Sequence, residues 1–227
     1  MTDSFKCEYC KKGFKKESTL AVHMCEPKRR YMQRDDKDVQ LGFRAYQLFY
    51  RIGTNSKKDK GYDDFAGSTY YSAFVKFGQY CIDVKIDDVP GYTTWLLQNG
   101  IKLDKWTSDK NFTAWIKERL KTESVDRAVE RTILHMQAWA EKDYGRHWAD
   151  YFKNGSTNMI VFDICAGRVS PWVLYATTDA QDMMDRLNAE QAKMIVDYAD
   201  PQYWQVRMFR NKDDVNWVRS IFEKATL

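Results

Sequence analysis

This sequence lacks long apolar runs and a secretory leader, and each absence removes a class of protein. No apolar segment approaches the roughly 20 residues that a membrane-spanning helix needs, so we expect no membrane partner. The start, "MTDSFKCEYC", has no apolar core of the kind found in signal peptides. We therefore expect an intracellular protein.

Catalytic motifs are also missing. The sequence contains no G-x-S-x-G, P-loop, G-x-G-x-x-G or H-E-x-x-H pattern, which disfavours the common hydrolases, NTPases and nucleotide-binding oxidoreductases. Histidine is scarce, with only His23, His135 and His147, and we expect His135 to lie at the edge or in the core of a helix. A D-x-K element, Asp83 with Lys85, leaves a metal-dependent nuclease open as an alternative. The absence of stronger motifs favours a protein without catalytic activity.

The chain is long enough for one medium domain and a small appendage. It has 227 residues, of which 44% are apolar and 15% aromatic, so a sizeable core can form. Periodic apolar positions predict a mainly α protein, in which residues 179–200 and 201–225 each form one helix. We place a small ββα-like zinc-finger module at residues 1–27, a charged linker at 28–38 and an α-rich globular domain at 39–227.

Three of the five cysteines fall within the first 25 residues, which in an intracellular chain indicates metal before disulfide. Cys7, Cys10, His23 and Cys25 follow the spacing C-x2-C-x12-H-x-C. A structural zinc site uses four nitrogen or sulfur ligands, commonly in two short pairs. The spacing therefore predicts a Zn²⁺ site of three thiolates and one imidazole. We expect Cys81 and Cys165 to be small core residues.

The same stretch resembles a two-cysteine, two-histidine zinc finger. The shared positions of that family are Phe5, Cys7, Cys10, Phe14, Leu20 and His23. The departure is at the end, where Cys25 replaces a second histidine that would lie one turn beyond His23. Residues two apart on a helix point to different sides, so the helix must stop near His23 for Cys25 to share the ion. We expect Pro27 to enforce that turn, because proline does not continue a helix.

The positive charge of the chain is concentrated near its start. Residues 1–34 hold nine basic and four acidic side chains, a net +5, whereas the remainder holds 27 basic and 28 acidic, a net −1. Electrostatic attraction to nucleic acid, with DNA as the expected partner, should therefore begin at the finger. The predicted phosphate-contacting residues are Lys11, Lys12, Lys15, Lys16, Lys28, Arg29 and Arg30. One finger covers only about 3 bp, so we expect largely non-specific binding.

The stretches "KKESTLAVHMCEPKRR", "YYSAFVKFGQYC" and "GRVSPWVLY" look like an uncharacterised protein family of large contractile-tailed bacteriophages. That resemblance implies a setting, a phage-encoded protein in the host cytoplasm, and no particular activity. The leading hypothesis is an accessory protein whose finger contacts nucleic acid and whose α-rich domain binds a phage or host protein in replication, transcription or packaging. The alternative is a protein-docking or virion-associated module that binds no nucleic acid.

Two features of the α-rich domain leave alternatives open. Arg168, in "GRVSPW", interrupts an apolar run, so it either pairs with a buried acid or meets a ligand. The domain is also rich in aromatics, some of which could form a stacking platform for single strands. The candidates are Tyr70, Tyr71, Tyr80, Trp95, Trp106, Trp115, Trp172 and Tyr175.

Overall fold

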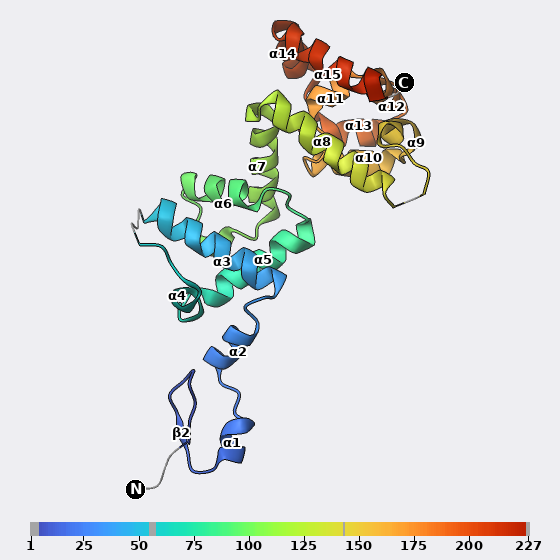
Figure 1. Cartoon of the computed structure of the whole chain (residues 1–227). Helices are drawn as coiled ribbons and strands as arrows, with labels where there is room; N and C mark the ends of the chain where they lie inside the picture. Colours follow the sequence, from blue (N-terminus) through green and yellow to red (C-terminus); the bar gives the residue numbers. More distant parts are fainter. Residues whose placement is uncertain (1–4, 55–57, 143, 226–227) are drawn as a thin grey trace. The chain divides into compact units, whose positions relative to one another are not determined.

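The computed structural model describes residues 5–54, 58–142 and 144–225. In these ranges the protein is mainly α-helical, as the sequence predicts, and its sheet consists of one short pair of strands (Figure 1). The chain forms two compact units, residues 1–112 and 113–227. Helix α7 (Asp109–Thr122) contains the boundary between them.

The first unit begins with a ββα arrangement, as the zinc-finger resemblance implies. Strand β1 (Phe5–Lys6) pairs antiparallel with β2 (Gly13–Phe14), with Phe5 opposite Phe14. The elements that follow are α1 (Glu17–Ala21), α2 (Glu26–Met32), α3 (Lys37–Leu48), the π-helical turn η1 (Phe49–Gly53), α4 (Tyr62–Ala66), α5 (Tyr71–Val84), α6 (Val89–Gln98) and the 3₁₀ turn η2 (Leu103–Lys105).

Helices α3 and α5 pack side by side, with their backbones in close contact (Figure 1). The contact is possible because Gly42 of α3 and Gly78 of α5 face the other helix and have no side chain. A Cβ on Gly42 would lie 2.6 Å from the carbonyl oxygen of Phe74, and one on Gly78 only 2.0 Å from that of Asp38. Around this contact packs an aromatic core in which Trp106 is fully buried. Other buried members are Tyr46, Phe65, Phe74, Phe77 and Tyr92.

The second unit is a bundle of short helices after α7. They are α8 (Val125–Ala140), the 3₁₀ turn η3 (Trp148–Asp150), α9 (Tyr151–Asn154), α10 (Thr157–Cys165), α11 (Pro171–Ala176), α12 (Thr178–Asp185), α13 (Ala189–Val196), α14 (Pro201–Arg210) and α15 (Lys212–Ala225). The most apolar segment of the sequence, 157–176, supplies α10 and α11 at the centre of the core. The indoles of Trp172 and Trp204 meet edge to face, 5.6 Å apart.

Two segments that read as single helices are each divided in the structure. Residues 179–200 were expected to form one helix, but Asn188 starts a new one: its side chain accepts from the Gln191 N–H, and Gln191 bonds back to the Asn188 N–H. Residues 201–225 divide at Asn211, whose φ of −122° and ψ of 57° are not helical. Both breaks use asparagine, a residue whose side chain competes for nearby backbone groups.

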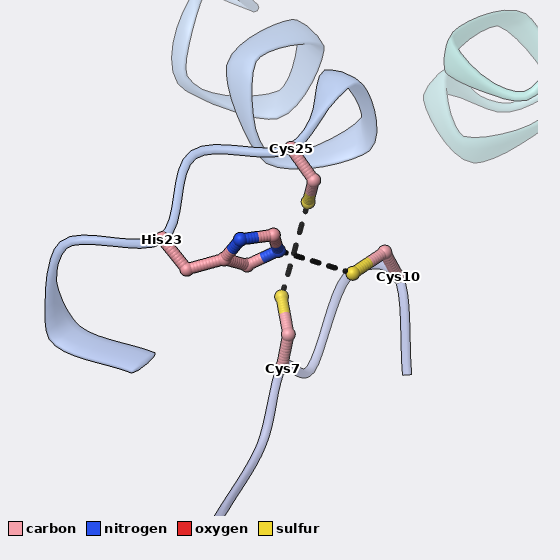
Figure 2. A group of neighbouring side chains, drawn as sticks. All are labelled: Cys7, Cys10, His23 and Cys25. Carbon is pink, nitrogen blue, oxygen red and sulfur yellow. Dashed lines mark hydrogen bonds between the residues drawn. The ribbon is translucent and has the colours of Figure 1, made fainter. Parts of the chain in front are cut away.

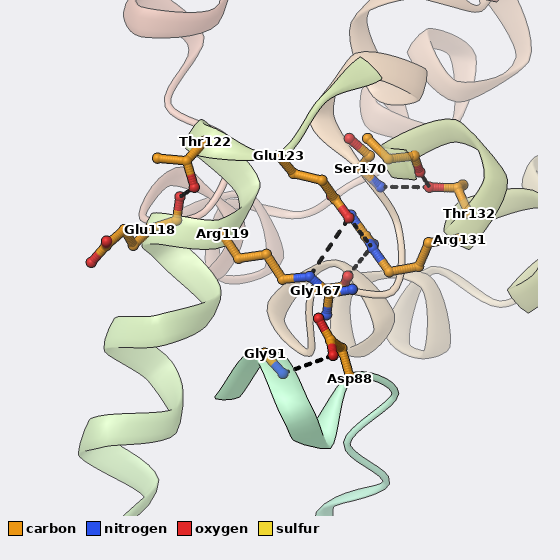
Figure 3. A network of polar contacts seen from close by, with 11 residues as sticks. Asp88, Gly91, Glu118, Arg119, Thr122, Glu123, Arg131, Thr132, Gly167 and Ser170 are labelled. Carbon is orange, nitrogen blue, oxygen red and sulfur yellow. Dashed lines mark hydrogen bonds and ion pairs between the residues drawn. The ribbon is translucent and has the colours of Figure 1, made fainter. Parts of the chain in front are cut away.

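A buried ion pair joins Glu123, just before α8, to Arg131 within α8, and a hydrogen bond from Arg131 reaches the turn before α11 (Figure 3). Arg131 donates to both carboxylate oxygens of Glu123, at 3.2 and 2.5 Å, and both side chains are 8% exposed. Arg131 also donates to the carbonyl of Gly167, which has a φ of +70°. Because a Cβ at Gly167 would lie 2.7 Å from Ile116 Cδ1, this turn accepts only glycine without rearrangement.

Candidate metal centre

Four side chains of the N-terminal finger converge on one point (Figure 2). The ligand atoms of Cys7, Cys10, His23 and Cys25 all lie within 4.8 Å of one another. The Cys7 and Cys25 sulfurs are 3.9 Å apart, and Cys10 Sγ lies 3.3 Å from His23 Nε2. This group could hold a metal ion, and it contains all four residues that the sequence predicts as ligands.

The strand pair positions the first two ligands on a tight knuckle. Cys7 follows β1, and its N–H donates to the Lys12 carbonyl at 2.9 Å, while the Lys11 N–H donates back to the Cys7 carbonyl at 2.9 Å. Lys11 closes the turn with a φ of 62°. The left-handed residue is thus Lys11 rather than a glycine, which sequence spacing does not reveal.

The other two ligands lie on either side of a helix end. Helix α1 ends at Ala21, and the His23 N–H donates to the Leu20 carbonyl at 3.0 Å in a last turn. Cys25 is extended, with a φ of −103° and a ψ of 164°, and its sulfur turns back toward the site. The expectation that the helix must stop near His23 is confirmed.

The expected role of Pro27 is wrong. Rather than blocking a helix, Pro27 lies in the first turn of α2, which begins at Glu26 directly after Cys25. A proline is tolerated there because the N–H groups of a first turn have no partner within the helix. Cys25 is therefore the residue before a new helix, and α2 extends through Met32 into the segment predicted as a linker.

The surroundings of the sulfurs differ. Cys7 is 3% exposed, and a hydrogen bond from the backbone N–H of Cys10 lowers the pKa of the Cys7 thiol. Burial raises the pKa of the Cys25 thiol. The ring of His23 packs against Phe14 with centroids 4.6 Å apart, which orients the imidazole. A bound cation would favour the thiolate form of each sulfur, because metals bind thiolates rather than thiols.

The predicted phosphate-contacting residues have different surroundings. Lys11, Lys12, Lys15, Lys16 and Arg29 are exposed. Lys28 is half-buried, and its Nζ lies 3.3 Å from the His23 carbonyl.

Arg30 instead takes part in packing within the first unit. Its guanidinium donates to the carbonyls of Ala66 and Ser68 at 2.7 and 3.2 Å and lies 4.4 Å over the Tyr71 ring. With a side chain only 18% exposed, Arg30 anchors α2 against α4 and α5.

The residues proposed for a nuclease do not gather into a cluster. In the described ranges, Cys7, Cys10, His23 and Cys25 form the one group of three or more potential ligands within coordination distance of each other. Asp83 accepts a hydrogen bond from Gln79 at 2.7 Å, and Lys85 ends α5 in the left-handed conformation. This arrangement gives Asp83 and Lys85 local structural roles.

Sequence reasoning missed a second polar cluster, which lies inside the second unit around Asp163. This aspartate is 3% exposed and lies 2.8 Å from Tyr151 Oη, 2.8 Å from His135 Nε2 and 2.9 Å from Arg168 Nη1. Burial by itself raises the pKa of Asp163, but hydrogen bonds from His135, Tyr151 and Arg168 outweigh it and hold the pKa below its usual value. Arg168 therefore pairs with a buried acid, the first of the two predicted alternatives.

Of the eight aromatic residues that could have formed a stacking platform, four are core residues, three are half-buried and one is exposed. Tyr71, Trp106, Trp115 and Trp172 are buried, whereas Tyr70 is 51% exposed.

Cys81 is buried and Cys165 is half-buried, and burial raises the pKa of the Cys81 thiol to about 12 and that of the Cys165 thiol to about 11.

Comparisons of this chain with known protein families, curated proteins and solved structures identify no relative. No family, no curated protein and no solved structure matches this chain. Among the described residues, no helix has the length and apolar character to cross a membrane. Functional inference therefore rests on the residues and their geometry.

Proposed function

We propose that the metal is Zn²⁺ and that it stabilises the finger. Three sulfurs and one imidazole nitrogen are a typical zinc ligand set, with Zn–S bonds of about 2.3 Å. A tetrahedron with bonds of that length has edges of about 3.8 Å, close to the 3.9 Å between the sulfurs of Cys7 and Cys25. A module with two-residue strands and no buried residue in α1 has little apolar core of its own, so zinc would supply the folding energy.

We further infer that the zinc-stabilised finger binds nucleic acid through its phosphates, as part of an accessory protein that also binds a protein partner. The observation that supports this proposal is the run of exposed lysines at Lys11, Lys12, Lys15 and Lys16, between the second ligand and α1. Lysine side chains held on one small rigid module attract phosphate without reading sequence. In the phage setting that the resemblance implies, DNA in the host cytoplasm is the expected target.

Sequence-specific reading receives little support from the finger helix. Lys16, Thr19 and Val22 occupy the positions that would face bases in a DNA-reading finger. Helix α1 is only five residues long, and the 82% exposed side chain of Val22 has no group that can hydrogen bond to a base edge. Binding should therefore be largely independent of sequence.

The test is the salt dependence of DNA binding. For the full zinc-loaded chain, replacing the four exposed finger lysines by glutamine should reduce the slope of log K against log salt by about 3.6, at about 0.9 per phosphate contact. A matched control replaces four exposed lysines on helices and turns of the same unit and should leave the slope unchanged; these are Lys76, Lys102, Lys105 and Lys110. An equal slope in both variants, or no DNA binding by the unmodified chain, would refute the proposal.

One observation favours the second candidate, a finger that docks protein. Val22 and Met24, on either side of His23, are 82% and 56% exposed. Exposed apolar side chains on a small rigid module are suited to being covered by a protein surface. If docking is the function, Val22→Ser with Met24→Ser should abolish partner capture while the four-lysine variant keeps it.

A further inference from the structure

A cavity of about 450 Å³ opens in the first unit, away from the four metal ligands. Three aromatic rings line it, one from each neighbouring helix: Tyr31 of α2, Phe43 of α3 and Tyr62 of α4. Asp63 and Asp64 line it as well. Aromatic faces combined with carboxylates are the surroundings in which organic cations bind.

The rings are held in defined orientations. Phe43 and Tyr62 meet at 78° with centroids 5.5 Å apart, so they form two walls nearly at right angles. The Tyr62 hydroxyl donates to the Arg30 carbonyl at 2.5 Å, and Tyr31 packs against Tyr9 of the knuckle at 5.3 Å. A ligand entering the cavity would meet walls that are already in place, which reduces the entropy cost of binding.

The charge of the lining is negative. Within the described ranges, neither Asp63 nor Asp64 forms an ion pair with a basic side chain; Asp64 Oδ2 accepts only the Gly61 N–H, at 3.1 Å. Arg34 also lines the cavity, but it lies 3.4 Å from Asp35 Oδ2 and donates to the Tyr31 hydroxyl at 2.8 Å. The lining therefore disfavours phosphate and favours a positive group.

We propose that this cavity binds an organic cation, a guanidinium or alkylammonium group. Guanidinium groups already lie over aromatic rings in and beside the cavity. Within the lining, Arg34 lies 4.9 Å over one side of Tyr31, and nearby Arg30 lies 4.4 Å over Tyr71. An entering cation would place its charge against Asp63 and Asp64 and its flat or methylene surface against the rings.

The proposal goes beyond nucleic-acid binding by the finger, because the two surfaces have opposite charge. The lysines of residues 11–16 attract phosphate, whereas the cavity attracts a basic group. The cation could be an arginine or lysine side chain of a partner protein or a free polyamine. Both share the chemistry that the cavity recognises.

The experiment titrates the full zinc-loaded chain with a capped arginine amide and, in parallel, with the capped citrulline amide. Citrulline has the shape of arginine without its charge. The readout is the NMR shift of the Gly61 backbone amide, which lines the cavity and bonds to Asp64. We expect the arginine compound to shift this resonance with a dissociation constant in the millimolar range and the citrulline compound to bind at least about tenfold more weakly.

Protein variants separate the aromatic and electrostatic contributions. Asp63→Asn should weaken arginine binding about threefold to tenfold, whereas Asp104→Asn, another exposed aspartate of this unit, should not. Tyr31→Leu should weaken binding by a similar factor, and Tyr31→Phe should retain it, because the ring face rather than the hydroxyl contacts the cation. Tyr31 is 37% exposed, so neither change removes a core side chain.

Three results would overturn the proposal: no shift of Gly61 with arginine, equal binding of citrulline, or equal effects of Asp63→Asn and Asp104→Asn. Comparing agmatine with arginine inside a short uncharged peptide then separates the two sources of the cation. Tighter binding of the peptide indicates a protein side chain, and tighter binding of agmatine a free amine.

Discussion

Replacing the proposed fourth ligand, Cys25→Ser, tests whether the four converging side chains together bind Zn²⁺. A serine hydroxyl stays protonated near neutral pH, so it cannot take the place of the thiolate. Structural zinc sites of this kind bind with about 10–16 kcal/mol. Since four ligand atoms lie at comparable distances around one point, each carries about a quarter of that energy, about 2.5–4 kcal/mol.

That loss corresponds to a zinc affinity about 10²–10³-fold lower. The assay is competition with a chromophoric chelator at fixed pH, together with zinc content after dialysis. Cys165→Ser is the matched control, because Cys165 is a half-buried cysteine of the second unit whose sulfur lies 3.6 Å from the Met194 carbonyl. If Cys25→Ser retains zinc within about threefold of the unmodified chain, or if Cys165→Ser loses as much, the assigned ligand set is wrong.

Three further predictions concern stability and are measured by urea unfolding. Gly78→Ala should destabilise the first unit by about 2–3 kcal/mol, because the new Cβ would lie 2.0 Å from the Asp38 carbonyl oxygen. In the control, Gly53→Ala, the Cβ meets only a side-chain atom at 3.4 Å, so the loss of stability should be smaller. Equal losses of stability would contradict the close helix contact. Lys85→Gly should stabilise the same unit by about 0.5–1 kcal/mol, because Lys85 is left-handed with a φ of 57°; a loss of stability would refute this. Asp163 has a lowered folded pKa, so its stabilisation is present above the unfolded value of about 4 and is lost as the pH falls through the folded value. The stability gap between the unmodified chain and Asp163→Asn should therefore narrow below about pH 4, and a constant gap would show that the carboxylate charge is not involved.

Sequence spacing predicted correctly which four side chains of the finger come together. Two short pairs of Cys and His ligands can bind one ion in only a few backbone arrangements. For His23 and Cys25 to share an ion with Cys7 and Cys10, the helix has to end near His23, and this was also predicted. The role of Pro27 was misjudged because proline both ends and begins helices, and the choice depends on where the chain goes next. That direction is set by the packing of α2, through Arg30, against α4 and α5.

Long-range partners were less accessible to prediction. That Arg168 either pairs with a buried acid or meets a ligand could be predicted without a structure, because a buried charge without a partner is costly. That the acid is Asp163, shared with Tyr151 and His135, follows from how α8, α9 and α10 pack together. The helix breaks at Asn188 and Asn211 were missed because the apolar pattern continues across both residues.

By itself, therefore, the sequence determined the elements whose physics is local: a mainly helical chain, the finger with its four converging Cys and His side chains, and the concentration of positive charge near the N-terminus. Only the tertiary structure decided which basic side chains are exposed and which, like Arg30, are used for packing. It also brought Tyr31, Phe43 and Tyr62 from three helices to one acidic cavity. The reason is that burial and shared cavities depend on contacts between residues distant in the chain, and residue spacing does not encode those contacts.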